Sequence, residues 1–548
     1  SNPTSTSTSS IDGRLFLGGS NTITASALVN IGGGGHIFTG IMTAPASSTT
    51  LIQTPAMNVG VAMRTSTPIP SVTIGSGASL TLEGLGGGRT ALVVGQEANA
   101  SSGINWSSVG NMDLSAGSAS LKLSSLVIGN TPLTGTETGS ATGTVTMSTS
   151  SLNHLDVSGS GNVIRIGTSA KTDTNANNST NGTLTIGHLG SNSSITSTDN
   201  NTAILIGHTT GTTVRPVTGT LALNGGTVTI TTTGAAIAGS NMTSNVTLSG
   251  GVTLRAGAAS SNWIHSVTNA TIGSGGANFD TNGHDLGMAQ VFTGVGGLTK
   301  AGDGTLILSG SQSYTGATNV SGGTLEIGPT GLINSSSGVT ISSGGSLAYN
   351  GSTALSTGVT FTSGTLGGTN WSGSLSGLTI GANQTISPGN SPGTANTGSQ
   401  AWDTSGTYVW EINDADNTAG SDPGWDLLAG TGTLDITATS GSPFTIRVTS
   451  LDEFNDRNPV FNFDGSQNYE WLIADFASIT GFEISKFAIN TSDFDNAFSG
   501  TFGIALGGTG PVPGDNSQIY LTYVAVPEPG TLALLAAAGL AAAFRRRR

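Results

Sequence analysis

One short pattern recurs at intervals of twenty residues in the first half of the chain. It stands as TVTM at 144–147, IRIG at 164–167, LTIG at 184–187 and ILIG at 204–207. An apolar residue at every second position is typical of a β-strand, because alternate side chains point to opposite faces. Recurrence at a fixed spacing indicates strands that stack in parallel, one strand per coil. The repeat therefore predicts a β-solenoid.

The repeat also predicts which side chains fill the core. Two inward columns are expected, one of Ile164, Leu184 and Ile204 and the other of Ile166, Ile186 and Ile206. The glycine that follows the strand marks a corner, where the backbone needs a positive φ or a close approach.

Composition agrees with a repetitive strand-and-turn body. The 548 residues include 85 glycines, and only 8% are charged. Disorder is the competing interpretation of such polar, glycine-rich sequence, and the periodicity argues against it. The chain has no cysteine, which excludes disulfides and thiolate metal sites.

The net charge of −14 is concentrated in one segment. Residues 401–500 hold 16 of the 30 acidic groups and only three basic ones. The remainder of the chain is close to neutral and lacks the broad basic surface that nucleic-acid binding needs. We therefore expect no nucleic-acid partner.

Residues 297–328 carry the most specific text of the solenoid. They read GLTKAGDGTLILSG, then YTGATNV after a short link, then SGGTLEIG. This segment resembles the autotransporter-associated β-strand repeat, and three strands are expected at 305–308, 315–320 and 324–327. The resemblance implies a coil of a right-handed parallel β-helix.

Composition divides the chain into four parts. Residues 1–10 are Ser, Thr, Asn and Pro almost throughout and are expected to be disordered or frayed. The solenoid is assigned to residues 11–398, ending near two Pro-Gly pairs. Residues 399–525 are acidic and aromatic-rich with alternating apolar positions, and predict a separate antiparallel β domain that caps the last coil. Residues 526–548 form the fourth part.

That fourth part reads VPEPGTLALLAAAGLAAAF followed by four arginines. It resembles the PEP-CTERM sorting signal, whose elements here are Pro527, Glu528, Pro529, an apolar helix and Arg545, Arg546, Arg547 and Arg548. A helix over 531–544 would be about 21 Å long, short for a hydrocarbon core of about 30 Å, with the arginines at the cytoplasmic face. A plain hydrophobic tail anchor is the alternative.

The resemblance implies a route to the cell surface. An exosortase-type enzyme would process the chain at the inner membrane of a bacterium with an outer membrane, and release it to the cell surface or extracellular matrix. Such a route requires an N-terminal leader. The chain begins at Ser1, so we expect either a removed leader or a fragment.

Two groups of residues are candidates for metal binding. His188 and His208 lie twenty residues apart and are expected to stack on the outer surface, where a shared metal ion competes with an ordinary polar ladder. Carboxylate and amide oxygens of a calcium site, or of a solvated acidic loop, are offered by Asp414, Asp416, Asn417, Asp422 and Asp426. The bland interpretation is favoured in both cases, because no third histidine-site ligand is visible and the loop does not match the EF-hand spacing.

Parallel β-helices also host polysaccharide lyases and hydrolases, which need clustered carboxylates or carboxylates with a base. Only Asp156 with Arg165, and Asp280 with Asp285, form groupings in the first 400 residues. We predict no catalytic, cofactor-binding or metal-binding residue. The sequence favours a structural or adhesive surface protein, with extracellular polysaccharide as a candidate partner; a polysaccharide-acting enzyme is the alternative.

Overall fold

The computed structural model describes residues 9–11, 13–16, 21–24, 29–33, 40–44, 46–61, 69–97, 106–131, 139–170, 178–210, 215–351, 353, 355–368, 377–389, 392–507 and 516–526. Within these ranges the chain is almost wholly β-strand, and two short 3-10 turns are its helical elements, η1 (Leu85–Gly87) and η2 (Ile484–Lys486). The chain forms two compact units, Ser1–Leu325 with Ser335–Ser337, and Glu326–Asn334 with Gly338–Arg548.

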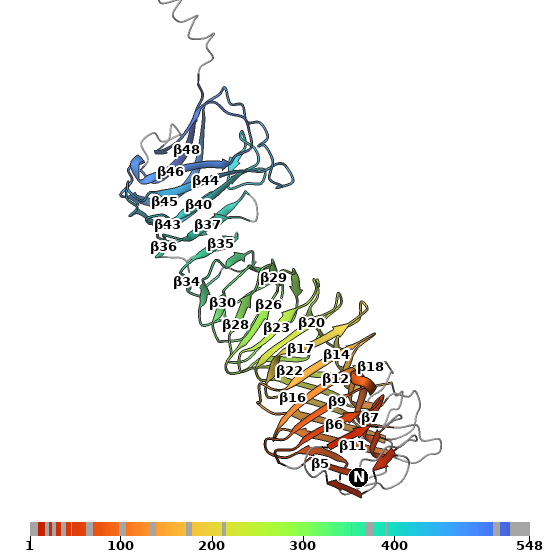
Figure 1. The fold of residues 1–548 in the computed structure, drawn as a ribbon. Helices are drawn as coiled ribbons and strands as arrows, with labels where there is room; N and C mark the ends of the chain where they lie inside the picture. The colour runs from red at the N-terminus through yellow and green to blue at the C-terminus, as the bar shows by residue number, and fades with distance from the viewer. Residues whose placement is uncertain are drawn as a thin grey trace, which may run out of the picture. The chain divides into compact units, whose positions relative to one another are not determined.

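The first unit is built from three ladders of parallel strands (Figure 1). The first ladder runs through β1 (Ser9–Ile11), β4 (Val29–Gly33), β7 (Ala56–Val61), β10 (Thr90–Gln96), β12 (Ser118–Thr131), β15 (Ile164–Ser169), β18 (Ile204–Thr209), β21 (Ile237–Gly239) and β24 (Ile264–His265). The second runs through β2 (Gly13–Phe16), β5 (Gly40–Ala44), β8 (Ser71–Ile74), β11 (Trp106–Leu114), β13 (Gly139–Met147), β16 (Thr180–Ile186), β19 (Val217–Leu223), β22 (Thr243–Leu248) and β25 (Asn269–Ile272).

The third ladder shares the long strand β12 with the first. It runs through β3 (Asn21–Thr24), β6 (Thr49–Gln53), β9 (Ser79–Glu83), β12, β14 (His154–Gly159), β17 (Leu189–Ser197), β20 (Gly226–Thr231), β23 (Val252–Ala256), β26 (Ala277–Asp280), β28 (Leu298–Ala301) and β30 (Thr318–Val320). A further parallel pair joins β27 (Leu286–Met288) to β29 (Thr305–Leu308). The prediction of a parallel β-solenoid is confirmed.

The predicted core columns are wrong in register. Ile164 pairs with Ile204 in the first ladder, whereas Leu184 pairs with Leu221 in the second. The same division separates Ile166 and Ile206 from Ile186. One coil takes 40 residues here and supplies two similar strands twenty residues apart. The period-two pattern shows that a strand is half-buried, but it does not show to which ladder the strand belongs.

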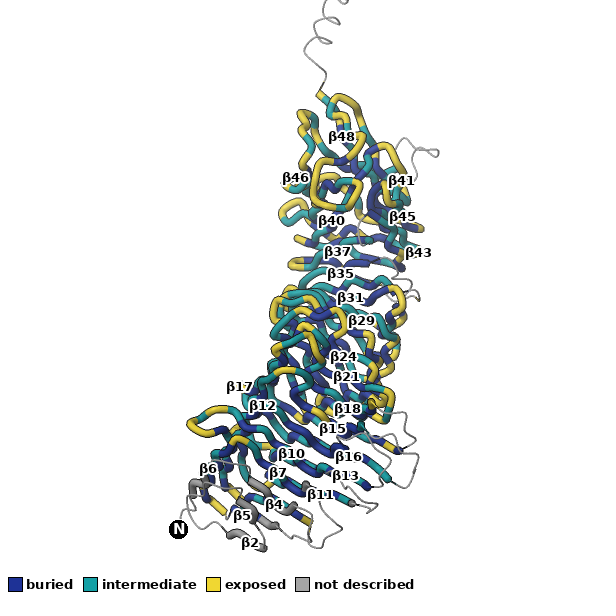
Figure 2. The backbone as a smooth tube through the Cα atoms, turned by 90° about the vertical axis from the view of Figure 1, so that its right-hand side faces the viewer, coloured by how far each residue is buried: buried dark blue, intermediate teal, exposed yellow. Residues whose placement is uncertain are grey.

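The inward direction of these side chains is confirmed. Ile164, Leu184 and Ile204 are each at most 1% exposed, and buried and half-buried positions alternate along the strands of the first unit (Figure 2). The repeat glycine also behaves as predicted at Gly167, where φ is +62°. A Cβ there would overlap the carbonyl oxygen of Thr218 in the second ladder, so the tight corner requires glycine.

The coils shorten along the first unit. In the first ladder the partner of Ile164 is 40 residues on, that of Ile204 is 33 on at Ile237, and that of Ile237 is 27 on at Ile264. Between Leu298 and Thr318 the interval is 20 residues. The predicted repeat segment is therefore one coil long. Its three expected strands are present as β29, β30 and β31 (Thr324–Ile327).

The second unit continues with parallel strands. One series joins β33 (Ser346–Tyr349), β35 (Gly364–Gly368), β37 (Gln384–Pro388), β40 (Thr407–Ile412), β44 (Phe444–Ser450) and β46 (Phe487–Asp493). Another joins β36 (Leu378–Ile380), β39 (Gln400–Trp402), β43 (Leu427–Ile436) and β45 (Tyr469–Thr480), with β38 (Thr394–Thr397) also beside β43. A separate parallel pair joins β32 (Val339–Ile341) and β34 (Val359–Phe361).

The prediction of an antiparallel domain over residues 399–525 is therefore wrong for most of its strands. Antiparallel pairing is confined to β48 (Gln518–Val524) with β45 and β47 (Thr501–Leu506), and to a single contact of β40 with β42 (Gly424–Trp425), which also lies parallel to β41 (Thr418–Ala419). Alternating apolar positions predict a half-buried strand of either direction, which explains the error. The series also cross residues 398 and 399 without a break.

The core of the second unit is aromatic. Trp402 and Phe444 stack with ring centroids 4.6 Å apart and planes 2° from parallel. Tyr408, Trp410 and Trp471 are also buried. Aromatic enrichment of this segment, read in the sequence as a separate domain, thus corresponds to a different filling of the same kind of parallel winding.

Two predicted elements stay predictions. The handedness of the winding is one, and the apolar helix over 531–544, which lies outside the described residues, is the other. No helix within the described ranges has the length and apolar content to cross a membrane. Of the N-terminal stretch expected to be frayed, residues 1–8 are outside the described part, while Ser9 and Ser10 belong to β1.

Candidate functional site

The two predicted stacked histidines lie in different parts of the coil. His208 is opposite Thr168 in the first ladder, and its Nδ1 is 2.7 Å from the hydroxyl of Ser240. His188 follows the second-ladder strand β16. The expected column of His188 over His208 is wrong, because twenty residues span only part of this coil. In the described part of the chain no three His, Asp or Glu side chains are grouped to hold a metal ion.

The acidic loop proposed for calcium is tied up by amide groups. Asn413 donates to Asp422 Oδ1 at 2.7 Å, and Asn455 donates to Asp422 Oδ2 at 2.9 Å. Asn462 donates to Asp414 Oδ1 at 3.0 Å. These bonds organise an amide-rich loop network.

Asp414 Oδ1 also accepts from the backbone N–H of Asp416, and Asn417 Nδ2 lies 3.4 Å from Asp414 Oδ2. Asp426 is fully buried and accepts from the backbone N–H of Gly393 at 2.9 Å and of Glu411 at 3.0 Å. The five predicted ligands therefore have separate partners, which favours the interpretation as an acidic loop.

Asp426 and Glu411 form a buried acidic pair that the sequence analysis missed. Burial raises the pKa of Asp426 well above its usual range. Burial also raises the pKa of Glu411 to about 7, against the opposing charge of Arg447. The available signal was the acidic residue inside the apolar run YVWEI at 408–412. Shifted carboxyl groups occur in active sites and in structural networks alike, and the two backbone bonds to Asp426 favour the structural role.

The two charge groupings predicted from the sequence are replaced by pairs between coils. Asp156 binds Arg89 at 2.9 Å, and Asp280 binds Arg255 at 2.7 Å. Asp285 accepts a hydrogen bond from the backbone N–H of Thr305. The expected pairing of Asp156 with Arg165 and grouping of Asp280 with Asp285 are wrong, because partners across coils depend on coil length, which varies.

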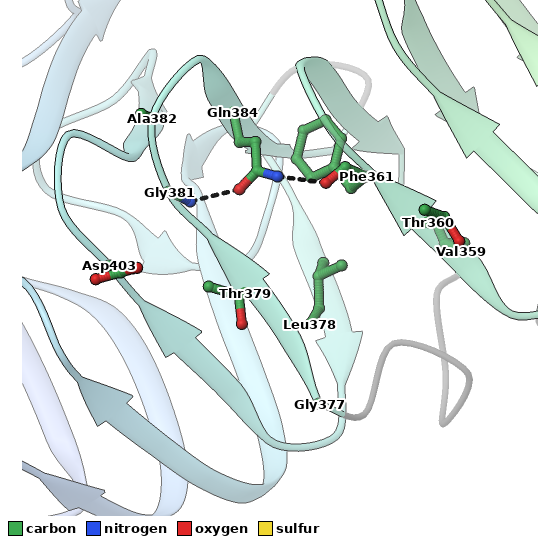
Figure 3. Close-up of a pocket in the computed structure, with 10 residues that line it drawn as sticks. All are labelled: Val359, Thr360, Phe361, Gly377, Leu378, Thr379, Gly381, Ala382, Gln384 and Asp403. Carbon is green, nitrogen blue, oxygen red and sulfur yellow. Dashed lines mark hydrogen bonds between the residues drawn. The ribbon is translucent and has the colours of Figure 1, made fainter.

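A pocket of about 440 Å³ opens in the second unit (Figure 3). Its lining residues are Val359, Thr360, Phe361, Gly377, Leu378, Thr379, Gly381, Ala382, Gln384 and Asp403. The amide of Gln384 bridges two strands, accepting from Gly381 N–H and donating to the carbonyl of Phe361 (Figure 3). Asp403 is the one titratable side chain among these residues. The pocket can therefore bind a polar group, but its lining supplies no acid–base pair.

The second ladder presents a flat, uncharged surface, which we call the threonine face. It is formed by the outward side chains of β13, β16, β19, β22 and β25, and their half-buried or exposed positions alternate with core positions. Two columns in register are Thr144, Thr183, Thr220, Asn245 and Asn269, and Thr146, Thr185, Ala222, Thr247 and Thr271.

Amide groups link part of this face between coils. Asn269 donates to Asn245 at 2.8 Å, and Asn245 donates to Thr220 at 3.3 Å. Parallel strands lie about 4.8 Å apart, so hydroxyl and amide groups repeat at that interval. The face offers many identical weak contacts rather than one enclosed site.

Comparison with known families assigns two segments of the chain. Residues 298–327 match the passenger-associated-transport-repeat, and residues 525–548 match the PEP-CTERM protein-sorting motif. The chain carries a PEP-CTERM sorting signal. No curated protein matches the chain. Both resemblances found in the sequence are thereby confirmed.

The PEP-CTERM motif and the repeat support an exported, cell-surface protein. The PEP-CTERM motif implies processing by an exosortase. Its expected sorting residues, Pro527, Glu528, Pro529 and Arg545 to Arg548, lie outside the described residues. The chemistry of sorting is therefore argued from the motif, and the surface chemistry from the two units.

Proposed function

We propose that this chain is a non-enzymatic structural or adhesive protein of the bacterial cell surface or extracellular matrix. Exosortase processing would free it from the inner membrane after transient anchoring through the C-terminal helix. Extracellular polysaccharide is its proposed partner. The role would be carried by repeated surface contacts and not by a catalytic centre.

The observation that carries this proposal is the threonine face. Thr144, Thr183 and Thr220 lie side by side on successive coils, and no charged residue stands in the two columns described above. A hydroxyl-rich, uncharged surface that repeats in one direction fits a partner that also repeats, such as a hydroxyl-rich polymer. Weak contacts at each coil add up when the partner engages several coils at once.

Attachment of cells to a polysaccharide-coated surface tests the adhesive role. A doubly substituted chain, T183K with T220K, breaks the face with two adjacent like charges. The matched control, T227K with T253K, places two lysines opposite each other in the third ladder. We expect the first variant to lose attachment and the control to retain it, with both still at the cell surface by antibody labelling. Equal attachment by both variants would contradict the adhesive role of this face.

The alternative is a polysaccharide-acting lyase or hydrolase on the same scaffold. The pocket beside Asp403 is the place for its substrate. Depolymerisation of acidic and neutral polysaccharides by the purified chain, followed by the release of reducing ends, tests this alternative. Release that is lost in Asp403→Asn would overturn the non-enzymatic proposal.

A further inference from the structure

A second, smaller cavity of about 210 Å³ lies in the first unit beside Arg165. Arg165 is an outward residue of β15, opposite Val127 on β12 and Leu205 on β18. Both neighbours are apolar, and Val127 is only 3% exposed. A guanidinium group thus interrupts an apolar column. Burial by these surroundings lowers the pKa of Arg165.

The acidic side chains near this site are engaged elsewhere. Asp156, the partner that the sequence suggested, is bound by Arg89 and by the hydroxyl of Ser194. Asp199 accepts from the backbone N–H of Gly161 at 2.7 Å and from Ser197 at 2.9 Å. Among the described residues no carboxylate lies within ion-pair distance of Arg165. The positive charge of Arg165 is therefore available to a ligand.

Polar side chains from successive coils complete the lining. Thr168 donates to Asn130 at 2.7 Å, and Asn130 donates to Gln96 at 3.0 Å. His208, the next residue of this column, is held by Ser240. Burial lowers the pKa of His208, so at neutral pH it adds a polar ring without a second charge. Side chains fixed in this way are arranged before any ligand arrives, which reduces the entropy cost of binding.

We propose that this pocket, called here the Arg165 pocket, binds the oxyanion group of an acidic ligand. Arg165 would meet a carboxylate or sulfate with its forked N–H groups, and the amide of Asn162, which also lines the cavity, would donate a further bond. The volume is below the roughly 300–1,000 Å³ of pockets that enclose whole drug-sized ligands. It suits one charged group, such as that of a uronic acid or a sulfated sugar at the edge of a polymer.

The oxyanion site is argued from the pocket alone. Only the assignment of that oxyanion to an acidic saccharide rests on the proposed surface role. The two claims are therefore tested in separate arms, and the binding arms use purified full chain, independent of where the protein resides in the cell.

The first arm measures binding of sodium sulfate and sodium glucuronate by isothermal titration calorimetry, with glucose as the neutral probe. We expect both anions and not glucose to bind the unsubstituted chain, and R165Q to weaken binding at least tenfold. The control R255Q removes an arginine that is already paired with Asp280 and should bind as the unsubstituted chain does. Equal binding by R165Q, or binding of neither anion, would overturn the site.

A second readout guards against loss of folding in R165Q. In R165L the column becomes apolar throughout, as it is at Leu205, so its Tm in anion-free buffer should equal or exceed that of the unsubstituted chain. Sulfate stabilises most proteins by exclusion from their surface, and this general rise should remain in R165L. The additional rise from site binding should be absent. An identical rise in both chains would contradict the proposal.

The last arm separates a free anion from an acidic polymer. Retention on immobilised polygalacturonate, with neutral dextran as the control matrix, should require Arg165 if the ligand is a saccharide. Binding of sulfate without retention would assign the pocket to a small free anion and overturn the saccharide assignment. A chain that reaches the cell surface but fails every binding arm would leave the proposed surface role standing and remove the Arg165 pocket.

Discussion

The two units wind their strands in the same way around different cores. In the first unit, aliphatic side chains such as Ile164 and Ile204 stack from coil to coil. In the second, Trp402 and Phe444 stack ring on ring, and a carboxyl group, Asp426, is buried beside them in the same unit. Backbone pairing and alternate burial are shared. Parallel winding therefore does not require an aliphatic column, and the core chemistry is free to change along one chain.

The largest expected effect is loss of an aromatic core residue. Trp402→Ala should lower the free energy of unfolding by about 3–5 kcal/mol, because it removes a fully buried ring and leaves a cavity. In the aliphatic core, Ile204→Val should cost only about 0.5–1.5 kcal/mol. Hydrogen exchange resolved by peptide should show each loss in its own unit.

Trp402→Phe is the matched control for the first variant. It keeps a ring against Phe444 and removes an indole N–H that has no hydrogen-bond partner, so it should lose much less stability than the alanine variant. Equal losses for the two variants would show that the stack is not what stabilises the second unit.

Next in size is the glycine corner, which belongs to the first unit. Gly161 and Gly167 both have positive φ, +72° and +62°, but only Gly167 faces the backbone of the neighbouring ladder. Gly161→Ala should cost about 1–2 kcal/mol for the left-handed conformation. Gly167→Ala should cost about 1–3 kcal/mol more, because the ladders must move apart. Thermal unfolding of the two variants measures the difference, and identical losses would refute the close approach.

A smaller effect, on the order of 1–3 kcal/mol, is expected from the pH dependence of the second unit. The pKa of Glu411 is raised from 4.5 to about 7. The folded chain keeps this proton where the unfolded chain has lost it. Stability from this group is therefore fully present below pH 4.5 and lost as the pH rises through 7. Urea unfolding between pH 4 and 8 should show the fall, and Glu411→Gln should make it shallower.

The smallest effect has the opposite sign and lies in the first unit. Lys300 is fully buried, and its ammonium group donates to the carbonyls of Ala301, Gly302 and Gly322. Burial lowers the pKa of Lys300 from 10.5 to about 8. Because the folded chain releases this proton first, stability should rise slightly between pH 8 and 10.5. Lys300→Met should remove that rise, and a rise that persists in Lys300→Met would assign it to another group.

Much of the fold could be predicted from the sequence because strands announce themselves locally. Alternate apolar positions identified the strands at 164–167, 184–187 and 204–207, and the glycine after Ile166 identified a corner. Ladder membership depends on coil length, which is set by loops whose length is not periodic. Two strands of one coil with the same text therefore looked like one strand of two coils.

The candidate sites were less predictable for the same reason. Arg165 lost its expected partner to Arg89, which lies two coils earlier, and His208 was placed over Thr168. Strand direction in residues 399–525 was also beyond the pattern, since alternation is the same in parallel and antiparallel sheets. The sorting signal was predictable because its motif is contiguous and needs no tertiary contact to be recognised.

Disulfide trapping tests the common parallel winding most directly, and the absence of native cysteine makes it clean. Thr146 pairs with Thr185 in the first unit, and Thr407 with Thr445 in the second. Neighbouring parallel strands bring such pairs within disulfide reach. We expect T146C/T185C and T407C/T445C to form internal disulfides under mild oxidation, mapped by mass spectrometry, while T185C/L205C, twenty residues apart, stays reduced. Bonding in T185C/L205C with none in the other two would contradict this winding.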